Sequence, residues 1–276
     1  MKPPPPPADP IVHPWTVAFD RVTISVTDLE AAAAFLHELL GGDRATVARV
    51  DVGDGPEKAV QIRLPGAPVE LIERPVAGIH HLAWWVDNLD ALLAQLEAAA
   101  WQAGSDRRTA WLIPERWFGV RVELRRGRAK PMEPTAPVRG RVHHFGIGVP
   151  DGPPALERFR SIFGGGRVGP VPWGSFTSVT IDQGVPFLGF IYPSEDDAER
   201  RGFVARFVDE RGPGVHHLAF DVWEMEEAIA VAEQHGVRLV NRSPAEGLVN
   251  DVFLHPSNPT GVLLRLTHQM RRSEDR

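Results

Sequence analysis

The chain has 276 residues, of which 43% are hydrophobic and 24% charged, and these values are typical of a globular protein with one large or two ordinary cores. The formal net charge of -6 gives no indication of a nucleic-acid partner, and no apolar run approaches the roughly 18 residues that a membrane-spanning helix requires. The chain has no cysteine, which excludes disulfides, thiolate metal ligands and cysteine nucleophiles and is compatible with a cytoplasmic location.

Both ends of the chain are polar or rich in proline. The N-terminus reads MKPPPPPADP and lacks the apolar core of a secretory signal. Because a proline run favours an extended backbone without internal hydrogen bonds, we expect residues 1–17 to form a disordered tail. Residues 269–276 are expected to form a short charged tail at the other end.

Four related runs divide the rest of the chain. Each is apolar at every second position and is followed by a helix signal, and the four runs begin at Asp20, Gly78, Val142 and Gly214. Alternation with a period of two predicts a half-buried strand. Four copies in one chain indicate an internal repeat of one structural unit, here called a module.

The first module opens at Phe19. A capping box over residues 27–30 predicts the start of a helix, an apolar stripe through Leu36 continues it, and Gly41-Gly42 ends it. Three strand-like stretches complete the module, at residues 46–52, 59–64 and 68–73.

The second module opens at Gly78, and its helix is predicted over residues 89–99. Strands are predicted near residues 110–113 and 120–124. The basic residues of the run 125–130 are interpreted as a solvated loop. Together the two modules form an expected first domain over residues 18–126, followed by a polar, proline-containing linker over residues 127–141.

The third and fourth modules form an expected second domain over residues 142–268. In the third module a helix begins at Pro153-Pro154, where proline fits the first turn, and stops at Gly164. A charged helical stretch leads from there to the fourth module. The predicted elements are strands at 175–181 and 186–192, helices at 198–211 and 225–235, and strands at 237–240, 251–254 and 261–267.

The alternation also predicts which side chains share a face of each first strand. In the fourth module it places His217, Ala219 and Asp221 on one face, whereas His216 lies on the apolar face that should meet the helices. The small, polar face is free to line a cavity. In the second module the same face carries Trp85, which either floors a pocket for an aromatic ligand or packs in the core.

This order of elements, repeated four times from Phe19 to Thr267, resembles the vicinal oxygen chelate superfamily, also called the glyoxalase/bleomycin resistance/dioxygenase superfamily. The run DERGPGVHHLAF at 209–220 and the run FLHP at 253–256 are similar to methylmalonyl-CoA epimerase. The run RGPGV is also similar to hydroxyphenylpyruvate dioxygenase. The resemblance implies an α+β fold in which four βαβββ modules pair into two open barrels.

In that superfamily two modules surround a divalent ion, and each module usually offers one ligand from its first strand and one from its last. The equivalent first-strand positions here are Arg21, His81, His144 and His217, and the last-strand positions are Glu70, Glu123, Gly189 (or its neighbour Leu188) and Arg265.

The resemblance implies a site for iron, zinc, manganese, nickel or cobalt on Glu70, His81 and Glu123, with His144 and His217 as the alternative ligands. Arginine has no lone pair to donate, so Arg21 cannot be a ligand. Arg21 either lies beside a metal or is itself the cation between two carboxylates, in which case no metal binds.

The pairing of the modules stays open. Neighbouring modules could pair, or the first could pair with the fourth and the second with the third. The second arrangement would gather His81, Glu123 and His144, the two-histidine, one-carboxylate set of non-haem iron enzymes.

The leading hypothesis is a metal-assisted isomerase, epimerase or lyase that acts on a small carbonyl or carboxyl compound through an enolate-type intermediate. Its expected catalytic residues are Glu123, His144 and His217, and its expected substrate-binding residues are Arg21, Trp85, His255 and Arg265. Arg265 replaces a last-strand carboxylate, which argues against methylmalonyl-CoA epimerase activity itself.

Two alternatives remain: an iron-dependent ring-cleaving or oxygen-inserting dioxygenase, and a metal-free protein that binds an aromatic or antibiotic-like molecule. All three hypotheses predict a small-molecule partner, without nucleic acid or membrane, for a monomer or a homodimer.

Overall fold

The structure is a computed structural model of the whole chain, and it describes residues 8–11, 13–51, 56–104, 108–129, 133–182, 186–195, 202–243 and 249–269. The chain divides into two compact units, which are described separately below. Unit 1 consists of Met1–Asp20, His81–Lys130 and His144–His216, and unit 2 consists of Arg21–His80, Pro131–His143 and His217–Arg276.

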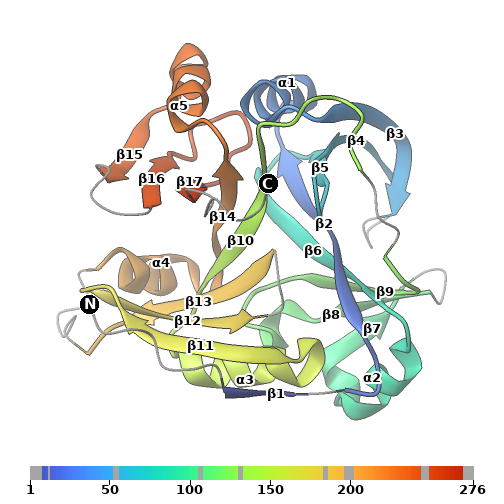
Figure 1. Cartoon of the computed structure of the whole chain (residues 1–276). Coiled ribbons are helices and arrows are strands. Elements are labelled where there is room, and N and C mark those ends of the chain that lie inside the picture. The colour runs from blue at the N-terminus through green and yellow to red at the C-terminus, as the bar shows by residue number, and fades with distance from the viewer. Residues whose placement is uncertain are drawn as a thin grey trace, which may run out of the picture. The chain divides into compact units, whose positions relative to one another are not determined.

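The secondary structure confirms four βαβββ modules in an α+β fold (Figure 1). The first module consists of β2 (Val17–Val26), α1 (Leu29–Leu40), β3 (Asp43–Asp51), β4 (Pro56–Arg63) and β5 (Val69–Glu73). The second consists of β6 (Gly78–Val86), α2 (Leu89–Gln95), β7 (Trp101–Ala103), β8 (Thr109–Leu112) and β9 (Val122–Arg126), with short 3-10 helices at Ala98–Ala100 and Pro114–Arg116.

The second half repeats this order. The third module consists of β10 (Gly140–Gly148), α3 (Gly152–Phe163), β11 (Gly165–Pro172), β12 (Phe176–Asp182) and β13 (Phe187–Pro193). Helix α4 (Phe203–Arg211) precedes the fourth module, which consists of β14 (Gly214–Val222), α5 (Met225–Gln234), β15 (Leu239–Ser243), β16 (Val249–Leu254) and β17 (Leu264–Gln269).

The strands form two mixed sheets that follow the two halves of the chain, except that β1 joins the sheet of the second half. One sheet has the order β3-β4-β5-β2-β6-β9-β8-β7, and the other has the order β1-β11-β12-β13-β10-β14-β17-β16-β15, where β1 is Ala8–Ile11. The residues of β2, β6, β10 and β14 are divided between the two units, so each unit contains one module from each half of the chain, apart from these shared strands.

The register within each module is the same in all four copies. The first strand runs parallel to the last, and the pairs are Thr23 with Glu70, Ala83 with Glu123, Gly146 with Gly189 and Ala219 with Arg265. The first partner in each pair lies two residues after the position predicted to face the cavity. Because side chains alternate along a strand, the cavity-facing positions of the four modules are structurally equivalent.

The apolar faces of the first strands form the cores of the modules. In β2, Val22, Ile24 and Val26 are completely buried, and in β14 the same holds for Leu218 and Phe220. The predicted helix of the first module is also confirmed. Its N-cap Asp28 accepts a hydrogen bond from the backbone N–H of Ala31, and the helix ends at Gly41, whose φ of 70° suits a residue without a Cβ.

The N-terminal prediction is wrong for its second half. Strand β1 pairs with β11, and Trp15 is buried and donates its indole N–H to the carbonyl of Ile162. The proline run dominated the prediction, although the segment after it carries apolar side chains that can be buried. Residues 1–7 lie outside the described residues, as do residues 270–276 of the predicted charged tail.

Two further strands were missed besides β1, namely β7 and β11. Strand β11 starts directly after α3 because Gly164, with a φ of 66°, reverses the chain between them. The glycine run had been interpreted only as a helix stop. Part of the expected linker is also fixed in unit 2, where Asp43 accepts hydrogen bonds from the backbone of Thr135 and Ala136. No helix in the described ranges has the length and apolar character needed to cross a membrane.

Candidate functional site

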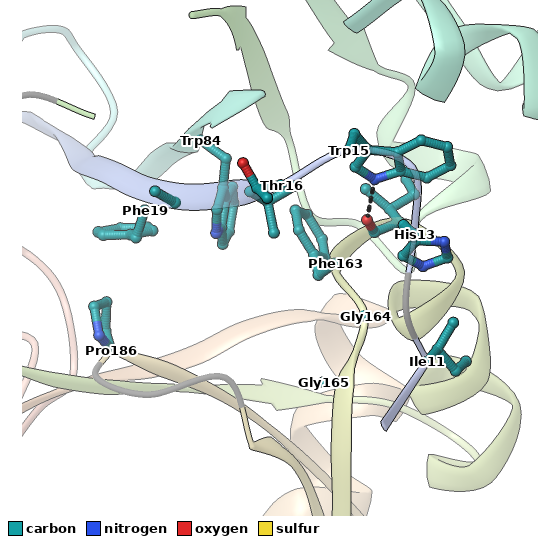
Figure 2. A pocket seen from close by; sticks show the side chains of 13 residues that line it. Ile11, His13, Trp15, Thr16, Phe19, Trp84, Phe163, Gly164, Gly165 and Pro186 are labelled. Atoms are coloured by element: carbon teal, nitrogen blue, oxygen red, sulfur yellow. Dashed lines mark hydrogen bonds between the residues drawn. The ribbon is translucent and has the colours of Figure 1, made fainter. Parts of the chain in front are cut away.

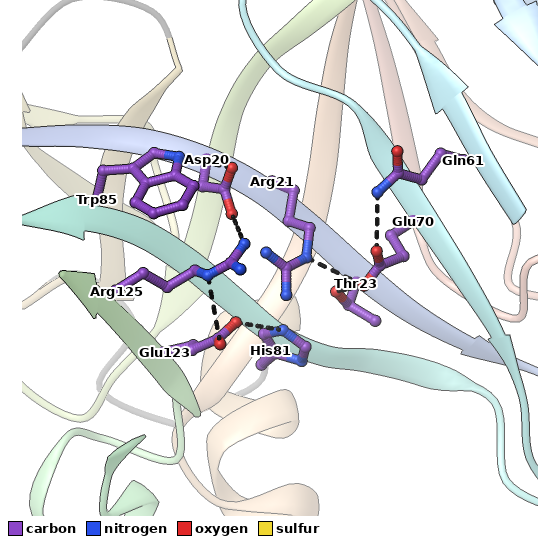
Figure 3. A network of polar contacts seen from close by, with 9 residues as sticks. All are labelled: Asp20, Arg21, Thr23, Gln61, Glu70, His81, Trp85, Glu123 and Arg125. Carbon is purple, nitrogen blue, oxygen red and sulfur yellow. Dashed lines mark hydrogen bonds and ion pairs between the residues drawn. The ribbon is translucent and has the colours of Figure 1, made fainter. Parts of the chain in front are cut away.

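The strongest candidate site in unit 1 is a buried histidine–carboxylate pair. His81 on β6 and Glu123 on β9 expose 1% and 3% of their surface, and Nε2 of His81 lies 3.4 Å from Oε2 of Glu123 (Figure 3). Ala83, next but one to His81, is opposite Glu123 in the parallel register, so both side chains project from the same face of the sheet. The period-two prediction therefore brings these two residues together correctly.

A second layer of side chains holds the pair in place. Arg125 lies two residues after Glu123 on β9, and its Nε is 3.7 Å from Oε1 of Glu123. Its other end donates to Asp20 at 2.8 Å, and Asp20 also accepts the indole N–H of Trp85 at 2.8 Å. The guanidinium of Arg125 lies 4.5 Å from the ring centre of Trp85, which fixes the charge over an aromatic face.

Trp111 packs against the imidazole ring of His81. Its ring meets the imidazole of His81 edge to face, with centroids 5.0 Å apart. The guanidinium of Arg121 lies 4.6 Å from the ring centre of Trp111. Trp111 therefore contacts His81 directly, and Trp85 is linked to Glu123 through Arg125. A guanidinium lies over the ring of each tryptophan.

The equivalent positions of the first module, in unit 2, form an ion pair instead. Arg21 donates its Nε to Oε1 of Glu70 at 3.0 Å, and both side chains are buried. The same oxygen accepts the hydroxyl of Thr23, and Oε2 accepts the amide of Gln61 at 2.9 Å (Figure 3). Both oxygens of Glu70 thus accept hydrogen bonds from donors of its own module.

These donors do not fit the metal site that the resemblance implied. A metal ligand must offer a lone pair, whereas the oxygens of Glu70 face three hydrogen-bond donors. Each oxygen of Glu123 likewise faces a nitrogen, of His81 or of Arg125. Among the described residues there is no group of three or more His, Asp or Glu side chains placed to hold a metal ion.

The other predicted residues lie in different surroundings. In unit 1, His144 is buried and stacks on Phe187 with centroids 4.8 Å apart. In unit 2, His217 is buried and meets Phe253 edge to face at 5.6 Å. Arg265 makes two hydrogen bonds to Asp251, at 3.0 and 2.6 Å.

His255 belongs to a turn. Its Nδ1 accepts from the backbone N–H of Ser257 at 3.1 Å, and its backbone carbonyl accepts from the side chain of Asn258. These contacts stabilise the turn, and they give the predicted substrate-binding role no structural support.

Burial lowers the pKa of two further histidines. His216 packs against Phe203 and Phe207, and desolvation, helped by the charge of Arg211, lowers its pKa to about 4. Desolvation is also the main cause that lowers the pKa of His143, although Asp221 opposes it. Both imidazoles are neutral near pH 7, as expected for residues on the apolar side of their strands.

Four residues around the pair were not predicted: Asp20, Trp111, Arg121 and Arg125. Arg125 had been interpreted as part of a solvated loop, yet it lies on β9. The alternation of residues 121, 123 and 125 is the signal that could have placed both arginines on the face of Glu123. No local pattern links Asp20 to Arg125, 105 residues away.

The comparisons with known proteins agree with the repeated module. The family model described as "Glyoxalase/Bleomycin resistance protein/Dioxygenase superfamily" matches residues 20–110 and 143–253. The mitochondrial methylmalonyl-CoA epimerases of Bos taurus and Homo sapiens are each 25% identical over 131 residues, which is 46% of this chain and 73% of theirs.

Two solved structures are similar over nearly the whole chain. A variant of 4-hydroxymandelate synthase from Streptomyces coelicolor gives a TM-score of 0.65 at 16% identity, covering 92% of this chain and 93% of its own. A catechol 2,3-dioxygenase gives 0.60 at 19% identity, covering 94% and 90%. At these identities the likeness shows a shared fold.

Proposed function

Because the chain belongs to the glyoxalase/bleomycin resistance protein/dioxygenase superfamily, we propose that it is an enzyme that moves a proton beside a carbonyl or carboxyl group of a small molecule. The reaction passes through an enolate-type intermediate, as in an isomerase, epimerase or lyase. The observation that carries the proposal is the buried pair of His81 and Glu123 beside Arg125.

The pair supplies the proton-transfer groups. A carboxylate and an imidazole are the side chains used most often as general base and general acid, and positioned proton transfer accelerates reactions by roughly 100- to 10,000-fold. Glu123 takes the proton from the carbon next to the carbonyl group and later returns a proton to the enolate, and His81 donates a hydrogen bond that holds the carboxylate in place. Burial of both groups keeps water from competing for the proton.

The arginines supply the positive charge. An enolate develops negative charge on oxygen, and a guanidinium already fixed in place stabilises that charge without reorganising during the reaction. Arg125 is fixed by Asp20 and by the ring of Trp85, and Arg121 by the ring of Trp111. These contacts support a role for the arginines in binding an anionic oxygen.

The substrate class follows from the same features and from the relatives. The epimerases named above act on an acyl-CoA thioester with a carboxylate next to the exchanging carbon. We propose a small 2-substituted carboxyl or carbonyl compound of that kind. Methylmalonyl-CoA serves as the first probe because it carries both groups; Arg265, which replaces a carboxylate expected from the resemblance, argues against it as the substrate itself, so other carbonyl compounds are tested beside it.

Deuterium exchange tests this function directly. The unaltered protein is incubated in D2O with methylmalonyl-CoA, pyruvate or phenylpyruvate, and proton NMR follows the loss of the C–H signal next to the carbonyl. We expect exchange with at least one compound and a rate at least about 100-fold lower in Glu123→Gln. The matched control is Glu115→Gln, an exposed carboxylate of the same unit, which keeps the full rate.

Two results would contradict the proposal. One is exchange that continues at the unaltered rate in Glu123→Gln. The other is saturable binding of these compounds without any exchange, which would favour the second candidate, a protein that only binds its ligand. The stacked pairs of Arg125 with Trp85 and Arg121 with Trp111 are the observation that keeps this second candidate open, because such pairs also bind planar anions without chemistry.

A further inference from the structure

A cavity of about 270 Å³ lies in unit 1, away from the pair described above (Figure 2). It is formed between the start of β2, strand β6 and the end of α3, and it reaches the surface beside the exposed Thr16. Engineered apolar cavities of about 150 Å³ take up molecules the size of benzene. The space is therefore sufficient for a compound with one or two aromatic rings.

Four aromatic side chains, those of Trp15, Phe19, Trp84 and Phe163, line the cavity. Trp84 lies 5.0 Å from Phe19 and 4.6 Å from Phe163 between ring centroids, and Pro186 lies across the gap in Figure 2. None of the described residues that line it is an Asp, Glu, Lys or Arg. A charged ligand would lose its hydration there without gaining a charged partner, so the cavity favours a neutral molecule.

One polar group of the cavity, the indole N–H of Trp84, is available to donate a hydrogen bond to a ligand. Trp84 exposes 1% of its surface, yet no acceptor among the described residues takes its indole N–H. Figure 2 shows this nitrogen at the edge of the ring that points away from its strand and into the cavity. Nε1 of Trp84 is not among the fully buried nitrogens without a partner in the described part of the chain, so it is open to the cavity, where a ligand oxygen can accept its N–H.

The other donors of the lining are already used. The indole N–H of Trp15 donates to the carbonyl of Ile162 at 2.9 Å, and Nε2 of His13 lies 3.0 Å from the carbonyl of Arg160. The hydroxyl of Thr16 donates to Asp87 at 2.8 Å. These bonds fix the N-terminal segment as a wall, so the cavity is formed before any ligand binds.

We propose that this cavity is a second small-molecule site, which binds a neutral aromatic compound through an oxygen acceptor that receives the N–H of Trp84. The site is distinct from the His81–Glu123 pair. Trp84 follows Ala83 on β6 and therefore points to the opposite face of the strand from His81 and Trp85. It does not depend on the proposed function, and its failure would leave that function untouched.

The probes are acetophenone and ethylbenzene, which have nearly the same shape but differ in the carbonyl oxygen. Titration followed by tryptophan fluorescence and by methyl NMR should give saturable binding of both, with shifts at the methyl groups of Ile11, Val17 and Ile162, which line the cavity. In Trp84→Phe, acetophenone binding weakens about fivefold, whereas ethylbenzene binding stays within twofold. The matched control is Trp173→Phe, an exposed tryptophan of the same unit, which changes neither affinity.

A cavity-filling variant completes the test. Ala18 lines the cavity, so Ala18→Phe should abolish binding of both probes. Binding that persists in a folded Ala18→Phe protein would overturn the proposal, as would methyl shifts located elsewhere or no saturable binding at all. If Ala18→Phe does not fold, the location of the shifts in the unaltered protein and the effect of Trp84→Phe decide the question.

Discussion

In the first module Arg21 and Glu70 form a buried ion pair, and in the second module His81 and Glu123 occupy the equivalent positions. The backbone register is the same, but the cation differs. A guanidinium stays protonated at any accessible pH, so the first pair is a permanent structural contact. An imidazole exchanges its proton near neutral pH, so the second pair can take part in proton transfer.

The hydrogen-bond partners of Glu70 and Glu123 also differ. Glu70 accepts three hydrogen bonds from donors of its own module, whereas the carboxylate of Glu123 lies 3.4 Å from the imidazole of His81 and 3.7 Å from the guanidinium of Arg125. Only the second pair joins a carboxylate to a side chain that can release and take up a proton, so the reaction is assigned to the second module.

The largest expected effect comes from a substitution that breaks the pair of Arg21 and Glu70. Glu70→Ala removes a buried carboxylate that accepts hydrogen bonds from Arg21, Thr23 and Gln61, and should lower the free energy of unfolding by about 3–5 kcal/mol, measured by urea denaturation. The double variant Arg21→Met with Glu70→Leu should recover much of this loss, because both charges are removed together. A loss below about 1 kcal/mol for Glu70→Ala would show that the pair is not a structural contact.

The buried His216 is expected to make the stability of the protein depend on pH, in contrast to the permanently charged Arg21. The pKa of His216 is lowered to about 4, so below pH 6.5 the unfolded chain binds a proton that the folded chain does not. Stability is therefore lost as the pH falls, by at most about 3 kcal/mol at pH 4.

The measurement is urea denaturation at pH 7.5 and at pH 4.5, compared with His216→Phe. That variant fits the surrounding Phe203 and Phe207 and removes the titrating group. It should lose less stability on acidification than the unaltered protein. An equal loss in both proteins would place the pH dependence on other residues.

A smaller effect is expected for the arginine of the fourth module. The side chains of Arg265 and Asp251 are 28% and 19% exposed, compared with 6% and 1% for Arg21 and Glu70. Solvent screening weakens such a pair, so Arg265→Met should cost about 1 kcal/mol or less in the same denaturation measurement. A cost equal to that of Glu70→Ala would mean that exposure does not separate the two arginine pairs.

No effect is expected from removing divalent metal. The carboxylate oxygens of Glu70 and Glu123 already face nitrogen or hydroxyl donors, so dialysis against EDTA should leave the deuterium-exchange rate of the unaltered protein unchanged. The control is the same protein carried through dialysis without EDTA. Loss of exchange that iron or zinc restores would show that these donors rearrange around a metal.

The sequence alone determined the modules and their register. Alternation with a period of two is imposed by the pleat of a strand, so it is visible in the residues themselves and placed His81 and Glu123 on one face correctly. Capping residues are equally local: the glycine stop of α1 is confirmed, and its N-cap is Asp28, one residue after the Thr27 that opens the predicted capping box.

The tertiary structure decided which partner each of these side chains has. Asp20 meets Arg125 across 105 residues, and Trp15 meets Ile162 across 147, and no local pattern carries such information. Strand β1 exists only because β11 offers it an edge. An ion pair or a cavity depends on segments brought together by the fold, which is why the sequence could name the polar positions but not their partners.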